Sequence, residues 1–241
     1  MKPAIQALDR RFYPSFSDNW DDLLLRDRIL RYLRPEHTVL DLGAGSGLVK
    51  QMNFLRKCKE VHGVDPEESV LENPHLDLAK VGTAERIPAN DCVYDLIFAD
   101  NILEHLTDPE RAFQEIYRTL KPGGIFLAKT PSRFHYVPLM AQATPIRLHR
   151  ALNKLRGRNE EDTFPTLYRA NSKRRLMKLA REAAFETVSV EQIEGRPEYM
   201  RISPLLYCFG LLYERVVNST EWFAGFRVLL ILVLRKPGHS D

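Results

Sequence analysis

Cysteine is scarce in this chain of 241 residues, and its few copies are scattered. The three cysteines, Cys58, Cys92 and Cys208, form no CxxC pair, and the seven histidines form no HExxH motif. An odd number of widely spaced cysteines argues against a disulfide framework and against a zinc site. We therefore expect no metal, and a protein of the reducing cytoplasm.

Long hydrophobic runs are also missing. The most apolar stretch, Phe226–Leu234, is too short to span a bilayer, and residues 1–16 lack the apolar core of a signal peptide. The net charge of +3 is too small to indicate nucleic-acid binding by itself. We expect neither a membrane-spanning segment nor a nucleic-acid partner.

The chain does contain a regular alternation of predicted strands and helices. The expected helices are Trp20–Leu33, Leu48–Arg56, Pro109–Leu120 and Ser172–Ala184. The expected strands are Thr38–Leu42, Glu60–Val64, Leu78–Val81, Tyr94–Ala99, Ile125–Lys129, Thr187–Ile193 and Phe226–Leu234. This alternation predicts an α/β fold with a doubly wound, mostly parallel seven-stranded sheet covered by helices on both faces.

A glycine-rich turn directly follows the first predicted strand. Residues 39–47 read VLDLGAGSG, with glycine at Gly43, Gly45 and Gly47. Glycine lets the backbone turn sharply and approach a ligand closely. A helix beginning after the turn would offer unpaired N–H groups to negative charge. Asp41, at the end of the strand, is suited to bind a cationic amine.

Dinucleotide-binding proteins also use a glycine-rich turn after a strand, so they are the competing interpretation. Dinucleotide-binding proteins carry GxGxxG, which would need a glycine where this chain has Leu48. Asp65 follows the second predicted strand, and a carboxylate there can accept hydrogen bonds from both hydroxyls of a ribose. The alternative for Asp65 is a turn-forming role before Pro66.

Five motifs occur in an order that resembles class I S-adenosylmethionine-dependent methyltransferases. They are VLDLGAGSG, HGVDP, VGTAERIP, DLIFADNILEHL and LKPGGIFLAKTP, and they cover residues 38–131. Within that family the chain looks most like the ubiquinone/menaquinone-biosynthesis type and its small-molecule relatives. The resemblance implies a Rossmann-like fold, S-adenosylmethionine as cofactor, S-adenosylhomocysteine as its product, and a small-molecule acceptor.

The resemblance also implies roles for the residues at the motif positions. The expected cofactor contacts are Asp41, Gly43, Ala44 and Gly45 around the methionine part, Asp65 with its neighbour Pro66 at the ribose, Thr83, Ala84 and Glu85 beside the adenine, and Asp100 and Asn101 near the reactive methyl. The family often has an acid where this chain has Thr83. Glu85 is therefore the candidate for the exocyclic amine of adenine.

Methyl transfer from a sulfonium is a direct displacement, so the protein mainly aligns the nucleophile and excludes water. A base is needed only if the nucleophile must lose a proton. His105 is the candidate base, because imidazole titrates near neutral pH. The alternative is that His105 packs at the sheet edge and bonds a backbone carbonyl. Glu104 is expected to be a solvated or helix-start acid.

One domain is expected over residues 1–241, with a helical lead-in (1–37), a cofactor-binding half (38–130) and two insertions (131–171 and 195–222). Loops that follow parallel strands reach the ligand end of the sheet, so we expect the insertions to cap it and bind the acceptor. The candidate acceptor-binding residues are Arg133, His135, Tyr136, Tyr168 and Arg169. They suit an anionic or sugar-like acceptor, and the alternative is a loop cover with surface arginines.

Segment 202–217, ISPLLYCFGLLYERVV, fits a core-packing helix, a lid, a dimer face or a shallow peripheral membrane contact. Together with a basic stretch between Arg147 and Arg158, it is compatible with a glycan- or lipid-linked acceptor, although such a stretch is also typical of a solvated helix face. The acceptor atom and the oligomeric state stay open.

Two other functions compete with methyl transfer. One is a non-catalytic cofactor-binding or interaction protein, and the other is a nucleotide-binding oxidoreductase. Proteins of the first kind usually lose the motif residues, whereas this chain keeps Asp41, Gly43 and Asp65. Leu48, in the place of a glycine, argues against the second.

Overall fold

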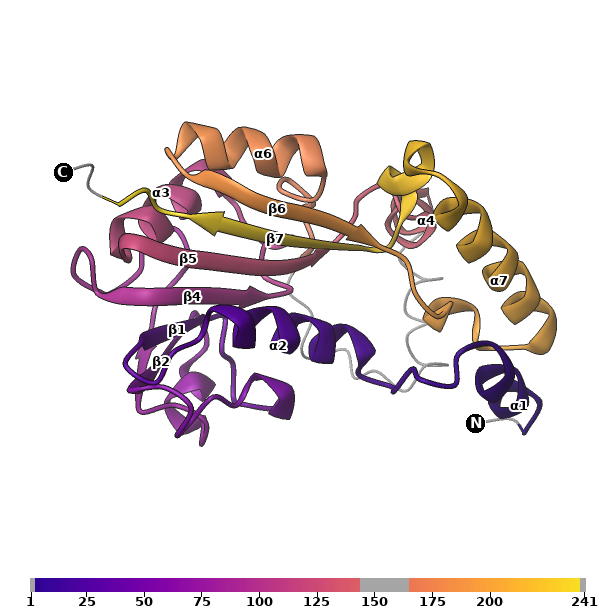
Figure 1. The fold of residues 1–241 in the computed structure, drawn as a ribbon, viewed down its shortest axis with the longest axis horizontal. Coiled ribbons are helices and arrows are strands. Elements are labelled where there is room, and N and C mark those ends of the chain that lie inside the picture. The colour runs from indigo at the N-terminus through magenta and orange to yellow at the C-terminus, as the bar shows by residue number, and fades with distance from the viewer. Residues whose placement is uncertain (1–2, 144–164, 239–241) are drawn as a thin grey trace.

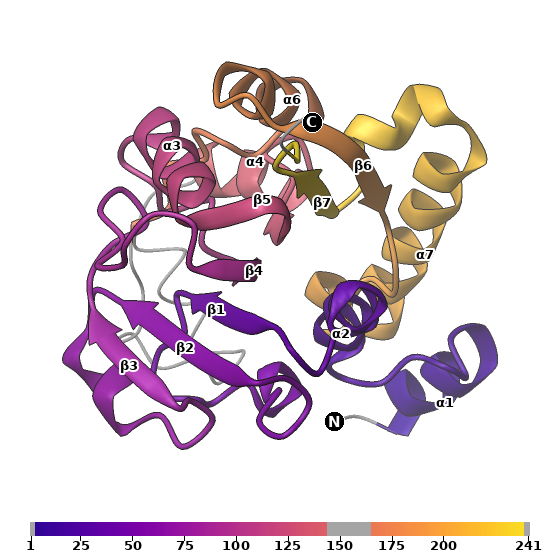
Figure 2. The same ribbon diagram turned by 60° about the vertical axis from the view of Figure 1, so that its left-hand side comes forward.

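A computed structural model describes residues 3–143 and 165–238, and the predicted basic stretch between Arg147 and Arg158 lies outside them. A seven-stranded sheet in the order β3-β2-β1-β4-β5-β7-β6 forms its centre (Figures 1 and 2). The strands are β1 (Thr38–Leu42), β2 (Glu60–Asp65), β3 (Leu78–Val81), β4 (Tyr94–Asp100), β5 (Leu120–Pro131), β6 (Glu186–Ile193) and β7 (Leu229–Arg235). Only β7 runs antiparallel to its neighbours, so the predicted α/β fold class is confirmed.

Helices cover both faces of the sheet. Helix α2 (Trp20–Tyr32) packs on one face, where its Leu25 and Ile29 join Val39 and Phe98 in one apolar core. Helices α3 (Pro109–Thr119) and α6 (Lys173–Glu182) pack on the other face, in a core that contains Phe113, Leu176 and Phe126. All five residues of β1 are buried, as expected for a parallel strand covered on both sides.

The predicted helix Leu48–Arg56 is wrong. Only the short 3-10 helix η1 (Lys50–Met52) forms there. Met52 and Phe54 are buried two residues apart, while Leu48 is 80% exposed, so the segment lacks the i, i+4 apolar face that an α-helix buries. No long helix N-terminus therefore adjoins the glycine turn, contrary to the expectation from the sequence.

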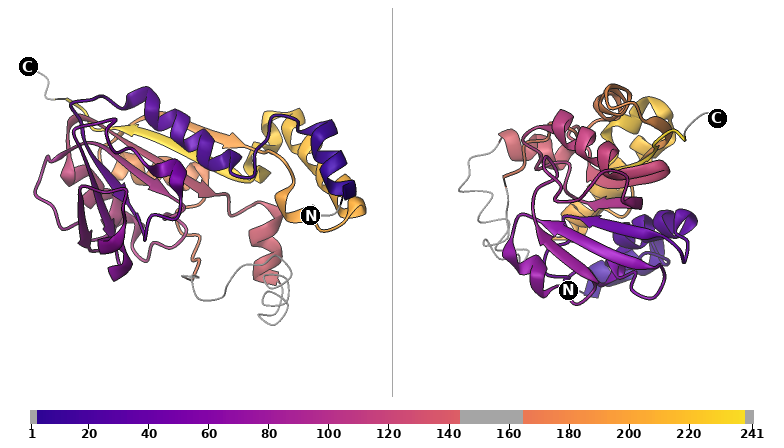
Figure 3. Two further views of the ribbon diagram at one scale, coloured as in Figure 1. Left: turned by 90° about the horizontal axis from the view of Figure 1, so that it is seen from below. Right: turned by 90° about the vertical axis from the view of Figure 1, so that its left-hand side faces the viewer.

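Several element boundaries differ from the prediction. β5 begins at Leu120 instead of Ile125, and β7 begins at Leu229, because residues Glu221–Phe226 form the 3-10 helix η5. Within the described residues, the segments expected to be insertions include the α-helices α4 (Tyr136–Ala143) and α7 (Pro204–Ser219). Both lie beyond the carboxyl ends of β4, β5 and β6, together with α1 (Pro3–Phe12) (Figures 1 and 3).

A small second core holds α1 against α7. Tyr207 is fully buried between them, and its hydroxyl donates to Asp9 Oδ1 at 2.9 Å. The Tyr13 hydroxyl donates to Glu214 Oε2 at 3.1 Å. Arg201 forms an ion pair with Asp9 at 2.7 Å. The start of the chain is thus fastened to the segment after β6 and completes the cap over this end of the sheet.

Helix α7 has one buried face and one exposed apolar face. Tyr207 and Val217 are buried, whereas Leu205, Phe209 and Leu212 are exposed. The inner face of α7 therefore packs in a core, which is one of the alternatives expected from the sequence. A lid, a dimer face or a peripheral membrane contact stays a prediction for its outer face. Within residues 3–143 and 165–238, no helix is long and apolar enough to cross a bilayer.

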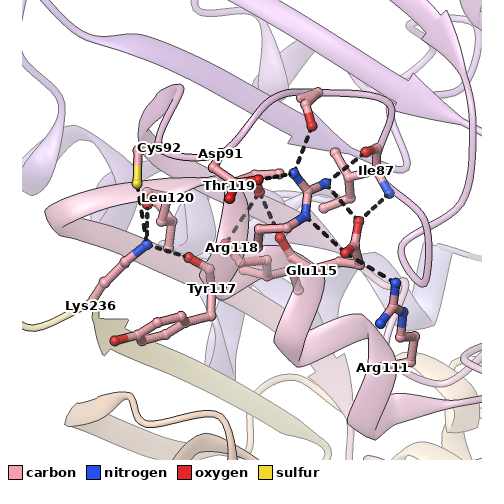
Figure 4. Close-up of polar contacts among 12 residues, drawn as sticks. Ile87, Asp91, Cys92, Arg111, Glu115, Tyr117, Arg118, Thr119, Leu120 and Lys236 are labelled. Atoms are coloured by element: carbon pink, nitrogen blue, oxygen red, sulfur yellow. Dashed lines mark hydrogen bonds and ion pairs between the residues drawn. The ribbon is translucent and has the colours of Figure 1, made fainter.

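The opposite end of the sheet is held by a network around Arg118 (Figure 4). The Arg118 guanidinium pairs with Glu115 at 2.8 Å and Asp91 at 2.7 Å, and donates to the carbonyl of Ile87 at 3.1 Å. Lys236, just after β7, donates to the carbonyl of Leu120 at 2.7 Å. These contacts fasten the loop before β4 and the end of β7, away from the cavities described below.

Asp108→Ala is expected to lower the free energy of unfolding by about 1 kcal/mol, the usual cost of removing an N-cap acceptor. The Asp108 carboxylate accepts from Arg111 N at 2.9 Å at the start of α3. Asp108→Asn retains an acceptor and should stay within a few tenths of a kcal/mol of the parent. Urea denaturation measures both, and equal losses in the two variants would rule out capping as the cause.

Candidate functional site

Three adjoining cavities open at the carboxyl ends of β1, β2 and β4. We call them the first cavity (about 450 Å³), the second cavity (about 510 Å³) and the third cavity (about 230 Å³). Gly43 lines the first and the third, Asn101 lines the first and the second, and His105 lines the second and the third. Because these residues are shared, the three cavities adjoin one another.

The glycine turn separates the first cavity from the third. Gly43, Gly45 and Gly47 have φ values of +83°, +47° and +82°, a region that favours glycine. A Cβ on Gly43 would lie 1.9 Å from Cδ1 of Ile102, whereas a Cβ on Gly45 would meet nothing within 4 Å. The turn is therefore packed tightly on one side and presents bare backbone to open space on the other.

Asp65 holds this turn in place. Its carboxylate accepts from Gly45 N at 3.0 Å and from Glu67 N at 2.9 Å. The side chain therefore organises the local turn, as the alternative from the sequence proposed. Asp65 also lines the third cavity next to Pro66, where a ribose-binding acid is expected. The two roles are compatible, since each carboxylate oxygen can accept more than one hydrogen bond.

Carboxylates dominate the first cavity. Asp41, Asp100, Asp21, Asp22 and Asp18 line it, with Ala44 and Gly43 from the turn. Burial and the nearby Asp100 and Asp65 raise the pKa of Asp41 well above its usual value, and burial raises the pKa of Asp100 to about 6. No lysine or arginine among the described residues lines this cavity. Its electrostatics favour a cationic ligand.

Lys129 supplies the buried counter-charge behind the first cavity. Its side chain is 0% exposed, and its ammonium pairs with Asp22 at 2.5 Å, Asp100 at 2.9 Å and Asp21 at 3.0 Å. Burial alone lowers the pKa of Lys129, but the three carboxylates raise it above its usual range. Lys129 thereby ties the start of α2 to the ends of β4 and β5.

The third cavity is a mostly apolar slot. Leu42, Val64, Ala84 and Leu106 line it beside Thr83 and Glu85. Glu85 Oε1 accepts from Thr107 N and Thr107 Oγ1, both at 3.0 Å. Glu85 therefore holds the loop that leads into α3. The sequence indicated Glu85 as the partner of the adenine amine and not this structural role.

The second cavity contains three of the five candidate acceptor-binding residues. His135, Tyr136 and Tyr168 line it, whereas Arg133 and Arg169 are exposed and do not. Arg133 instead stacks over the Phe134 ring, and Arg169 bonds the carbonyl of Thr107. The prediction that these two arginines face the acceptor therefore loses its geometric basis.

Glu104 is not the solvated acid expected from the sequence. It is 5% exposed, lines the second cavity, and accepts from Thr130 Oγ1 at 2.7 Å. Asn171 Nδ2 donates in turn to Thr130 Oγ1 at 2.6 Å, which holds the hydroxyl in place. Burial raises the pKa of Glu104 to about 7, although the Thr130 hydrogen bond lowers it. A carboxyl group that titrates near neutrality inside a cavity is suited to proton transfer.

His105 Nδ1 lies 3.2 Å from the carbonyl oxygen of Pro165, an acceptor, so that nitrogen carries the hydrogen. The structure thus contains the carbonyl contact of the structural alternative, and it also places the ring at the wall of two cavities. A catalytic role for His105 stays a prediction.

Backbone strain marks two of the wall residues. Asn101 has φ +55° and Tyr168 has φ +51°, a region that is costly for a bulky side chain. The Tyr168 conformation is stabilised by hydrogen bonds from Leu167 N and Tyr168 N to the carbonyl of Glu104, at 2.7 and 3.1 Å. Strain of this kind clusters at ligand sites.

Other residues of the second cavity were not predicted. They come from the chain start and from the segment after β6, and include Trp20, Asp18, Glu194, Arg196 and Tyr199. Only their position after a predicted strand or before a predicted helix could have indicated them. Within the described ranges, no group of three His, Cys, Asp or Glu side chains has the arrangement of a metal site.

Comparison with known proteins gives a consistent result. The family described as "Methyltransferase domain" matches residues 40–128. A probable S-adenosylmethionine-dependent methyltransferase of Mycolicibacterium smegmatis is 30% identical over 105 residues, which cover 42% of this chain and 40% of that protein. A malonyl-[acyl-carrier protein] O-methyltransferase of a Marinomonas species is 32% identical over 134 residues, which cover 50% and 48%.

The fold agrees with these matches. The crystal structure of the YcgJ protein of Bacillus subtilis has a TM-score of 0.56 at 21% identity, over 91% of this chain and 99% of that one. The chain spans about half the length of the curated relatives it matches. The order of motifs, the sheet topology and the matching domain lead to one assignment. Residues 40–128 match a methyltransferase domain, and the fold is that of the class I S-adenosylmethionine-dependent methyltransferases.

Proposed function

We propose that this protein transfers a methyl group from S-adenosylmethionine to a small-molecule acceptor held in the second cavity. The observation that carries the proposal is that the first and second cavities share part of their walls. Asp18, Asp21 and Asn101 line both the first and the second cavity, so a ligand in one adjoins a ligand in the other. A site for cofactor binding alone would not need the second cavity.

The residues present fit S-adenosylmethionine. The first cavity has an excess of carboxylates that a cationic amino-acid part would offset, with Asp41 as the acid at the end of β1. The third cavity offers apolar walls for a flat base, with Asp65 at its edge for the ribose. From the glycine turn, Gly43, Ala44 and Gly47 line the first cavity and Gly43 lines the third, whereas Gly45 lines neither. We assign Ala44, Pro66, Thr83, Ala84 and Asn101 to the walls around the cofactor.

When bound, S-adenosylmethionine supplies an electrophilic methyl carbon: the acceptor nucleophile bonds to it, the carbon–sulfur bond breaks, and that electron pair stays on sulfur. The chain's own residues then have two tasks. The walls of the second cavity orient the acceptor and exclude water. A side chain must also take any proton that the nucleophile loses, and Glu104 and His105 are candidates among the titratable groups that line the second cavity.

Calorimetry should detect binding of S-adenosylmethionine and S-adenosylhomocysteine with dissociation constants in the micromolar range, about −8 kcal/mol. NADH should give no signal, because the third glycine of its motif is replaced by Leu48. Binding of NADH without either sulfur ligand would overturn the proposal. Binding of the sulfur ligands without product formation from any of a broad set of small-molecule acceptors would favour the non-catalytic alternative.

A further inference from the structure

The second cavity is rich in acidic and aromatic groups. Its carboxylates are Asp18, Asp21, Glu104, Glu194 and Glu198, and its large aromatic side chains are Trp20, Tyr136, Tyr168 and Tyr199. Arg196 is the one lysine or arginine among the described residues that line it. A cavity with this lining disfavours an anion and favours a cation, both by charge and by the negative faces of the aromatic rings.

Several charged side chains in the wall of the second cavity already have an ion-pair partner. Arg196 is 3% exposed, and its guanidinium contacts Glu198 at 2.6 Å and Asp18 at 3.0 Å. Asp21 pairs with Lys129 at 3.0 Å. Among the described residues, the one lysine or arginine of the wall is therefore paired with two of the wall's own carboxylates and is not available to an anionic acceptor.

Glu104 and Glu194 are the carboxylates left over. Within the described ranges, neither has a lysine or arginine within ion-pair distance. Glu194 Oε2 accepts from Val228 N at 2.9 Å, and burial raises its pKa to about 8. Glu104 is fixed by Thr130 at the end of β5. The charges of Lys129 and Arg227 lower the pKa of Glu104 and of Glu194 respectively, but burial outweighs them, so a cation bound beside either carboxyl group would favour its ionised form.

A second observation concerns His135 in the wall of the second cavity, because one of its ring nitrogens has no hydrogen-bond partner among the described residues. His135 is 1% exposed, and its Nε2 makes no hydrogen bond within the described part of the chain, lying 3.6 Å from Glu194 Oε2. Its Nδ1 accepts from Val137 N at 3.4 Å, so the hydrogen resides on Nε2. Burial lowers the pKa of His135 to about 3, which keeps the ring neutral. A buried N–H donor without a partner points to a hydrogen-bond acceptor on the ligand, which must be an atom other than an ammonium nitrogen.

We propose that the acceptor is a small molecule bearing a basic amine, that its ammonium group is bound by Glu104 between the aromatic walls of the second cavity, and that Glu104 takes the proton which frees the nitrogen lone pair. This inference rests on the proposed function and gives it a substrate class. The proton passes from the ammonium nitrogen to a carboxylate oxygen of Glu104. The neutral amine that results is the nucleophile for the methyl carbon.

The geometry explains why Glu104 has this role rather than Glu194. Glu104 directly follows the loop that starts at Asn101, which lines the first and second cavities. Glu194 lies after β6 and faces His135. The carbonyl of Glu104 also holds the strained Tyr168 backbone, so one residue positions an aromatic wall and presents the carboxylate.

The test uses three probes that share a phenyl ring and a two-carbon chain but differ in charge: phenethylamine, 2-phenylethanol and phenylacetate. Each is titrated by calorimetry into the protein saturated with S-adenosylhomocysteine. Phenethylamine should bind at least about tenfold more tightly than phenylacetate, the scale of one charged hydrogen bond. Equal binding of the three, tighter binding of phenylacetate, or no binding of the amine would overturn the inference.

Glu104→Gln keeps the size of the side chain and removes its charge. It should weaken phenethylamine binding by about tenfold to a hundredfold and leave 2-phenylethanol within about twofold. Glu110→Gln, which removes an exposed carboxylate on α3 paired with Arg175, is the matched control and should change neither. Retained selectivity for the amine in Glu104→Gln would exclude Glu104 as its binding group.

Two readouts keep the failures apart. The affinity for S-adenosylhomocysteine, measured first on the parent and on each variant, reports the cofactor site and the folded state. If the parent does not bind it, the proposed function fails. If the parent binds it but shows no preference for the amine, only the substrate class fails. The comparison of the three probes on the parent protein requires no variant, so a poorly folded Glu104→Gln would not protect the inference.

Discussion

Lys129→Met is expected to lower the free energy of unfolding by about 3–5 kcal/mol, the scale of breaking a buried ion pair from one side. The methionine fills a similar volume but leaves Asp21, Asp22 and Asp100 without their shared cation. Because Asp21 and Asp22 belong to the first turn of α2, the start of that helix should loosen from the ends of β4 and β5.

The loss should depend on pH in a direction that the carboxylates determine. Burial already raises the pKa of Asp100 to about 6, and removal of Lys129 should raise it further. A carboxyl group whose pKa is higher in the folded state binds more protons there, so stability falls as pH rises through that pKa. The penalty should therefore be larger at pH 8 than at pH 5.

Urea denaturation at the two pH values measures this effect. Lys178→Met is the matched control, because Lys178 is exposed and pairs with the exposed Glu182 at 3.6 Å. An exposed pair of this kind contributes about 0–1 kcal/mol. A similar small loss in both variants, or a larger loss for Lys129→Met at pH 5 than at pH 8, would show that the buried cation does not balance these carboxylates.

Asp65→Ala is expected to weaken S-adenosylhomocysteine binding by about tenfold to a hundredfold, or about 1.5–3 kcal/mol, the cost of losing hydrogen bonds to a charged acceptor. The structure adds a second cause. The Asp65 carboxylate also holds Gly45 N and Glu67 N, so the glycine turn should become less ordered when the side chain is removed.

Asp95→Ala is the control for Asp65→Ala. Asp95 also accepts from a backbone amide, Thr38 N at 2.9 Å, and pairs with Lys121, but it lies at the amino ends of the strands. Its removal should cost stability without changing cofactor affinity. Calorimetry on both folded variants decides the question: unchanged affinity in Asp65→Ala would reduce Asp65 to a turn-forming residue.

The local features of this fold could be predicted from the sequence. β1 and β3 have the predicted bounds, and α2, β2 and β4 agree to within one residue. Short-range patterns indicate β1, β4 and α2: the strands are largely apolar and buried, and the helix has Leu25 and Ile29 four residues apart on one face. The glycine turn was also predictable. Gly43, Gly45 and Gly47 have positive φ values, and glycine is favoured in this region by the local sterics of the backbone.

Failures of prediction have a common physical origin in contacts between residues far apart in the chain. The buried Glu104 accepts a hydrogen bond from Thr130 of β5, and the buried Lys129 pairs with Asp21 and Asp22 of α2. The sequence around each residue contains no trace of these partners. The same limit explains Arg133 and Arg169, which stand next to cavity residues in the sequence but point elsewhere.

The sequence by itself therefore determined the family, the order of the strands' motifs and the cofactor to expect, because these depend on backbone geometry and on motifs confined to short segments. Only the tertiary structure decided the character of the second cavity. Its walls come from the chain start, from the loop after β4 and from the segments after β5 and β6. Whether an acid there is solvated or left without a counter-charge depends on which of those distant segments meet, and that is settled by packing.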